Sequence, residues 1–190
     1  METMDKQVID HFNSLLCMND QDKINQYFTG VIINISTDAI SYMVHNGADP
    51  MYLFGTPFIR ICHYGTFDKI KYFIDEFVID DNVKCGSDAL IAVLNNPYVS
   101  DVVTTIKYLL DSGFVITDRV IEQCIYGDRD DKFIKLFVEY GFEIERIGQI
   151  FWKHYATDYD FIVNNILYLS KFGLDLNQSI NQFGRDIQKN

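Results

Sequence analysis

The chain has 190 residues, a net charge of −11 and 48% hydrophobic residues. This is enough apolar material for one buried domain, and the small number of prolines and the lack of a Ser/Gly-rich linker argue against long disordered segments. Acidic residues are spread along the chain without a basic stripe, which disfavours duplex nucleic acid and anionic membranes as direct partners. The charge either keeps the protein soluble or attracts a basic partner.

The four cysteines lie far apart and form no Cys-x-x-Cys pair: Cys17, Cys62, Cys85 and Cys124. Their spacing favours reduced, mostly buried thiols over disulfides or a zinc site. The first residues lack the apolar core of a signal peptide, and no apolar run approaches the ~18 residues that a membrane span requires. We therefore expect a soluble protein in a reducing intracellular compartment such as the cytoplasm.

The first part of the chain predicts short helices. Apolar residues recur at helical spacing over 5–18 and again over 20–28, with Asp5 as the expected N-cap of the first helix. The run 31–35 is rich in β-branched residues and is interpreted either as a strand or as a buried connection. One of the hydroxyl residues at 36–37 is expected to cap the next helix.

The stretch 55–82 is typical of one complete helix-turn-helix unit. It opens with Thr56-Pro57, turns at Gly65, and continues over 66–77 with apolar residues along one helix face. Variants of this unit are expected along the chain, because its closing turn recurs at regular intervals.

That closing turn contains a glycine in four copies, Gly47, Gly113, Gly141 and Gly173, and Phe77 takes its place in the central unit. These five positions are 30, 36, 28 and 32 residues apart, which is the period of a two-helix solenoid repeat. Glycine adopts the left-handed conformation that ends a helix sharply without a steric cost. We therefore predict a left-handed C-cap at each of the four glycines.

Between these turns, short helices that are apolar on more than one side alternate with longer ones. Short helices are expected at 89–94, 120–125 and 147–155, the first of them beginning after Ser87-Asp88. Longer helices are expected at 100–111, 130–140 and 157–172. The pattern predicts an all-α chain of helical hairpins.

These residues resemble the ankyrin repeat, a unit of about 33 residues with a turn and two antiparallel helices. Thr56-Pro57 is similar to its Thr-Pro opening, Gly65 stands at its interhelical glycine, and 47–49 and 173–177 resemble its Gly-Ala-Asp-Val-Asn ending. The resemblance implies an all-α, ankyrin-like helical-hairpin solenoid of about five repeats with irregular, shortened β-turn fingers. The composition, rich in Ile, Asn, Tyr and Phe, is similar to ankyrin-repeat proteins of large DNA viruses, which would place the protein in the host-cell cytoplasm or the virion.

The chain also departs from the ankyrin pattern. Ile59 stands where the family has a histidine, the copy between 113 and 141 is short, and 95–100 lengthens a loop. A solenoid of the tetratricopeptide or HEAT type is the alternative architecture. We expect a single domain with three parts: N-terminal capping helices at 5–35, repeats at about 36–177, and a C-terminal capping helix at 178–188.

No residue pattern indicates catalysis. The adjacent pair Cys62-His63 would point about 100° apart on a helix, and the four histidines form no ligand pair. The acids at 128–139 resemble a calcium loop, but Phe133 stands where such a loop needs glycine. We expect no enzymatic activity, no cofactor and no metal site.

The resemblance implies a non-catalytic module or adaptor for protein–protein interaction, with another protein as partner and without direct binding to nucleic acid or membrane. In ankyrin-like stacks the turn tips and the short inner helices form the binding face. The expected partner-binding residues are Tyr52, Phe54, Tyr64, Asp81, Lys84, Arg119, Trp152 and His154. The alternative function is an acidic inhibitor or nucleic-acid mimic that competes electrostatically for a basic partner.

Overall fold

The computed structural model describes residues 2–77, 82–126, 131–155, 167 and 169–175. Within these ranges it contains ten α-helices and no strand, which confirms the all-α prediction. The chain divides into two compact units, Met1–Val115 and Ile116–Asn190. The single domain over 1–190 stays a prediction, and the predicted capping helix at 178–188 lies outside the described residues. So does most of the helix predicted at 157–172.

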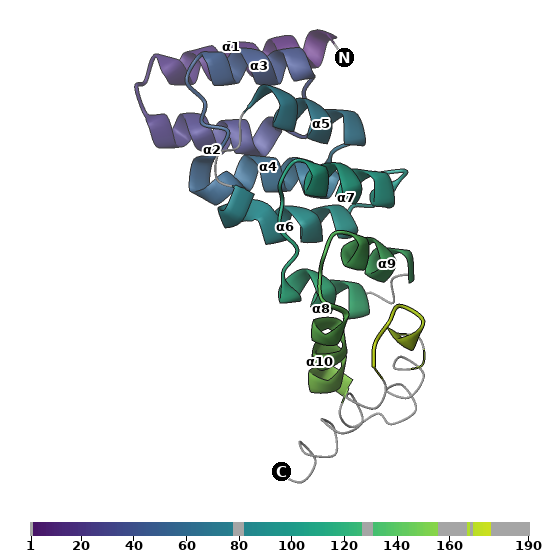
Figure 1. The fold of residues 1–190 in the computed structure, drawn as a ribbon. Helices are drawn as coiled ribbons and strands as arrows, with labels where there is room; N and C mark the ends of the chain where they lie inside the picture. The colour runs from purple at the N-terminus through teal and green to yellow at the C-terminus, as the bar shows by residue number, and fades with distance from the viewer. Residues whose placement is uncertain (1, 78–81, 127–130, 156–166, 168, 176–190) are drawn as a thin grey trace. The chain divides into compact units, whose positions relative to one another are not determined.

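The first unit contains seven helices (Figure 1): α1 (Glu2–Leu16), α2 (Gln21–Val31), α3 (Thr37–His45), α4 (Tyr52–Tyr64), α5 (Phe67–Glu76), α6 (Asn82–Leu94) and α7 (Val102–Asp111). Helix α2 packs against α4, and α4 packs against α6, so the even-numbered helices of this unit form a row. Helix α5 packs on α4, and α7 packs on α6, so each of these inner helices is covered by the helix that follows it in the chain. Helix α1 closes the start of the unit against α2 and α3.

The second unit contains α8 (Asp118–Tyr126), α9 (Asp131–Glu139) and α10 (Ile144–Tyr155). Helix α8 packs against both of the others. The guanidinium of Arg146 on α10 forms an ion pair with the carboxylate of Asp118 at the start of α8. Because both side chains are largely exposed, this pair contributes little to stability.

The core of the first unit is built on fully buried aromatic and aliphatic side chains. Phe58 of α4 is 0% exposed, and its ring lies 5.4 Å from Phe73 of α5 and 5.7 Å from Phe114 after α7. Such ring pairs add to the free energy of burying the apolar area. Phe73 belongs to the apolar helix face that the periodicity predicted over 66–77, and its burial confirms that prediction.

The four predicted glycine C-caps are also confirmed. Gly47, Gly113, Gly141 and Gly173 have φ values of 107°, 93°, 86° and 103°. In each case the residue after the glycine donates its N–H to the carbonyl five residues earlier, as in Phe142 to Phe137 at 2.9 Å. This C-cap hydrogen bond gives a partner to one of the last carbonyls of the helix, and the left-handed glycine reverses the chain.

Replacing Gly141 with valine is expected to destabilise the protein by about 1 kcal/mol or more, because valine is strained at positive φ. A β-carbon at this position meets no atom within 4 Å, so the cost is conformational and not steric. Gly30→Val is the matched control, since Gly30 lies inside α2 and a β-carbon there also meets nothing within 4 Å. Thermal melts that show equal losses for both variants would contradict the left-handed cap.

Gly65, the predicted interhelical glycine, is needed for a different reason. Its φ of −86° suits any residue, and its N–H donates to the carbonyl of Ile61 at 2.7 Å to end α4. A β-carbon at Gly65 would lie 2.6 Å from that same carbonyl oxygen. The close approach of two backbone segments therefore requires glycine at this turn.

Two expectations about helix boundaries were wrong, and one open alternative is decided. Asp5 does not cap α1, which begins at Glu2; its carboxylate accepts a hydrogen bond from the N–H of Ser36 at 3.2 Å and so supports the start of α3. For the run 31–35, where a strand and a buried connection were both expected, the buried connection is correct: Val31 ends α2, and Ile32 and Ile35 are buried in the turn that follows. Helix α6 begins at Asn82 and continues through Ser87, because burial of the side chain of Cys85 outweighs the local preference for a cap.

Candidate functional site

Three consecutive residues at the start of α4 adopt the left-handed conformation. Leu53 has φ 48° and ψ 57°, Phe54 has φ 61° and ψ 38°, and Gly55 has φ 82° and ψ 21°. Left-handed backbone costs roughly 1–2 kcal/mol for each residue with a β-carbon, and such residues normally occur singly. We name residues 52–55, which are these three and the residue before them, the left-handed turn. Its strain persists only if the surrounding structure holds it.

Hydrogen bonds and close packing fix the left-handed turn at both ends. Before it, the carboxylate of Asp49 accepts from the N–H of Met51 at 2.8 Å. After it, the hydroxyl of Thr56 donates to the carbonyl of Leu53 at 2.7 Å. Gly55 faces α6 so closely that an added β-carbon would lie 3.1 Å from the β-carbon of Cys85. The right-handed part of α4 then begins around Pro57, where the absent N–H costs no helical bond.

Two side chains of the left-handed turn, those of Leu53 and Phe54, point away from the core. Leu53 is 60% exposed and Phe54 is 74% exposed, whereas Tyr52 is half-buried. Single exposed apolar residues are ordinary on protein surfaces, but here two adjacent ones lie on strained backbone. Strain of this kind is concentrated at binding and active sites.

The first turn of α2 lies against the loop that leads into the left-handed turn. The side-chain amide of Gln21 donates to the carbonyl of Gly47 at 2.7 Å. The side-chain oxygen of Asn25, which is only 4% exposed, accepts from the N–H of Asp49 at 2.9 Å and from Gln21 at 3.1 Å. Because buried polar atoms are costly unless paired, this contact holds α2 and the loop in one arrangement.

Tyr64, another predicted binding residue, lies at the opposite end of α4. It is 45% exposed, and its ring stacks on that of His63 with centroids 4.3 Å apart. Eight residues of helix separate it from Thr56, which corresponds to about 12 Å of rise. Tyr64 and the left-handed turn therefore belong to different ends of the same helix.

The end of α4 that carries Tyr64 is joined to the loop after α6 through Asn96. The amide of Asn96 donates to the carbonyls of Cys62 and Gly65, both at 2.8 Å, and its oxygen accepts from the N–H of Tyr98 at 2.7 Å. Tyr98 is 64% exposed, and the sequence prediction missed it. The lengthened loop at 95–100 was the signal that could have found it.

The remaining predicted residues do not extend the left-handed turn. Arg119 is exposed on α8 in the second unit. Trp152 and His154 fall within α10, and Lys84 falls within α6, but their side chains lie outside the described residues. Asp81 lies outside them altogether. Of the eight predicted residues, the structure brings together Tyr52 and Phe54 and adds Leu53 to them.

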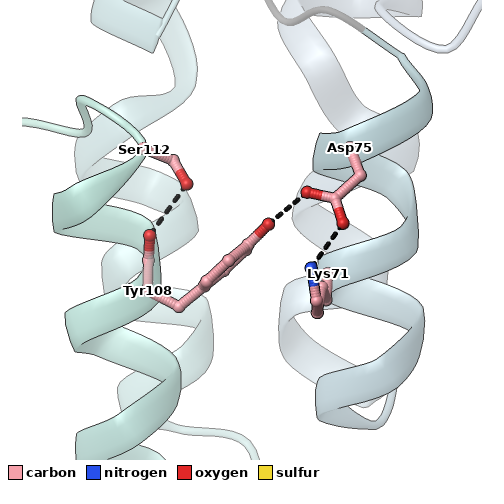
Figure 2. Close-up of polar contacts among 4 residues, drawn as sticks. All are labelled: Lys71, Asp75, Tyr108 and Ser112. Carbon is pink, nitrogen blue, oxygen red and sulfur yellow. Dashed lines mark hydrogen bonds and ion pairs between the residues drawn. The ribbon is translucent and has the colours of Figure 1, made fainter.

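A polar contact joins the outer helices α5 and α7 (Figure 2). The ammonium of Lys71 donates to the carboxylate of Asp75 at 2.5 Å, and the hydroxyl of Tyr108 donates to the other oxygen of that carboxylate. Hydrogen bonds from Lys71 and Tyr108 lower the pKa of Asp75, while burial and the bond to Asp75 raise the pKa of Tyr108. Both changes favour the ionised acid beside a neutral phenol, and because Lys71 and Asp75 are exposed, this contact links the two helices but adds little to stability.

Burial makes the thiol of Cys62 a poor nucleophile. Cys62, Cys85 and Cys124 are buried, as predicted, and Cys17 is exposed. Burial raises the pKa of the Cys62 thiol well above its ordinary value, and the neighbouring Cys85 acts in the same direction. Because the thiolate is the reactive form, Cys62 is unreactive, and its role is to fill the core.

Comparison with family models, with curated proteins and with solved structures finds no match for this chain. None of the helices in the described part of the chain is long and apolar enough to cross a membrane. Across those same residues, no group of three or more His, Cys, Asp or Glu side chains is placed to hold a metal ion.

Proposed function

We propose that this chain is a non-catalytic protein–protein interaction module built from ankyrin-like helical hairpins, and that the left-handed turn is part of its binding face. The observation that carries the proposal is the pair Leu53 and Phe54, which are exposed, apolar and held on strained backbone. Burying these side chains against a partner would release free energy at roughly 25 cal/mol per Å² of apolar area. In the isolated chain these side chains stay in contact with water, so this free energy is not gained.

The packing of helices in the first unit supports the ankyrin-like part of the proposal. In a repeat solenoid each inner helix contacts the inner helix of the next repeat, and each outer helix covers its own inner helix. The succession of α2, α4 and α6, with α5 and α7 beside the last two, follows that rule. The left-handed turn lies in the segment between α3 and the right-handed part of α4, where an ankyrin-like repeat places its finger.

Affinity isolation from an extract of the source cells tests the proposal. We expect the double variant Leu53→Ser/Phe54→Ser to lose proteins that the parent chain captures, because the apolar contact is removed. The matched control is Met18→Ser/Val115→Ser, which replaces two exposed apolar side chains of the first unit that lie outside the left-handed turn. Quantitative mass spectrometry that finds the same proteins on the parent and on the Leu53→Ser/Phe54→Ser variant would overturn the proposed binding face.

A further inference from the structure

Helix α2 and the loop 46–51, which lead up to the left-handed turn, carry more acidic than basic side chains. Asp22 is exposed in the first turn of α2, and Asp49 is exposed in the loop that leads into the turn. On α2 and the loop 46–51, all of which the structure describes, the one lysine or arginine is Lys23. Its ammonium already pairs with Asp20 at 2.8 Å. Two exposed carboxylates therefore lie on the two segments that lead up to the left-handed turn, α2 and the loop 46–51, and these segments carry no unpaired cation.

The charge of the whole first unit has the same sign. Residues 1–115 carry 15 acidic and 7 basic side chains, which gives a net charge of −8. A surface of one sign raises the local concentration of partners of the opposite sign and speeds their association. It also repels a second copy of the same chain, because that copy would present the same carboxylates.

We propose that the left-handed turn takes a cationic peptide segment that carries an apolar side chain. The apolar side chain packs against Leu53 and Phe54, and flanking lysine or arginine side chains pair with Asp22 and Asp49. This inference rests on the proposed function and names the chemistry of the partner. The apolar contact supplies most of the affinity, and the charges select cationic segments and add salt dependence.

A displayed library of randomised 12-residue peptides separates this inference from the proposed function. Peptides are selected on the parent chain and then screened against Leu53→Ser/Phe54→Ser. We expect the peptides that lose binding to this variant to be rich in Lys or Arg together with apolar residues. If such turn-dependent peptides are neutral or acidic, the charge inference is overturned while the binding face stands. If no selected peptide depends on Leu53 and Phe54, both proposals fail.

Charge variants test the role of the two carboxylates with one selected cationic peptide, measured by fluorescence anisotropy. We expect Asp22→Asn/Asp49→Asn to weaken its affinity about fivefold at low salt, since exposed charge pairs contribute modestly. Asparagine at 49 keeps an acceptor for the N–H of Met51, so the turn is retained. The control Asp10→Asn/Glu76→Gln removes the same net charge from exposed sites on α1 and α5. Equal weakening by both double variants would overturn the local pairing.

Discussion

Replacing Asn96 with leucine is expected to destabilise the first unit by about 3 kcal/mol. Asn96 is 5% exposed, and its side chain pairs with three backbone groups: the carbonyls of Cys62 and Gly65 and the N–H of Tyr98. Leucine has a similar volume but no hydrogen-bonding atom, so all three groups lose their partner. Each buried polar group without a partner costs about 1–3 kcal/mol, and solvent near the loop recovers part of the loss.

Denaturant unfolding followed by far-UV circular dichroism measures this effect. The neighbouring Asn95 is the matched control, because its side chain makes one bond, to the carbonyl of Ile91 in the last turn of α6 directly before it. We expect Asn95→Leu to cost less than 1 kcal/mol, since the lost bond is local and partly exposed. An Asn96→Leu variant as stable as Asn95→Leu would show that Asn96 does not join α4 to the loop after α6.

The contrast between these two asparagines indicates which parts of the fold the sequence could predict. The glycine C-caps were predictable because a left-handed cap depends on the last turn of one helix and the residue after it. Helix faces such as that of α5 were predictable for the same reason, since their spacing is local. Asn96 was not, because its partners Cys62 and Gly65 lie 34 and 31 residues away. Asp5 was wrongly predicted to cap its own helix for the same reason, because its hydrogen-bond partner Ser36 is distant in the sequence.

The candidate site was predicted only in part. Tyr52 and Phe54 were named because aromatic side chains in turn segments are frequent binding residues. Leu53 was missed, although it is 60% exposed, because leucine in an apolar run is normally assigned to the core. The left-handed backbone could not be predicted for Leu53 and Phe54, since their intrinsic preference opposes it. It depends instead on the packing of Gly55 against Cys85 and on the hydrogen bonds of Asp49 and Thr56.

The strain of the left-handed turn leads to a prediction in which stability and binding change in opposite directions. The double variant Leu53→Gly/Phe54→Gly is expected to be more stable than the parent by about 1 kcal/mol. Glycine removes a left-handed penalty of roughly 1–2 kcal/mol at each position and returns about half of that gain through the greater entropy of the unfolded chain. Little burial is lost, because both side chains are mostly exposed.

The double variant Leu53→Ala/Phe54→Ala separates backbone strain from the loss of the side chains. Alanine removes the apolar surface but keeps a β-carbon at positive φ, so we expect it to be as stable as the parent and about 1 kcal/mol less stable than the glycine variant. Both variants should bind the selected cationic peptide at least about tenfold more weakly than the parent, because each lacks the apolar contact. Denaturant unfolding and fluorescence anisotropy on the same preparations give the two quantities. If the alanine variant proves as stable as the glycine variant, Leu53 and Phe54 are not left-handed in solution, and the strain argument for the binding face fails. If the glycine variant gains stability and keeps full affinity, the turn is strained for a reason other than binding.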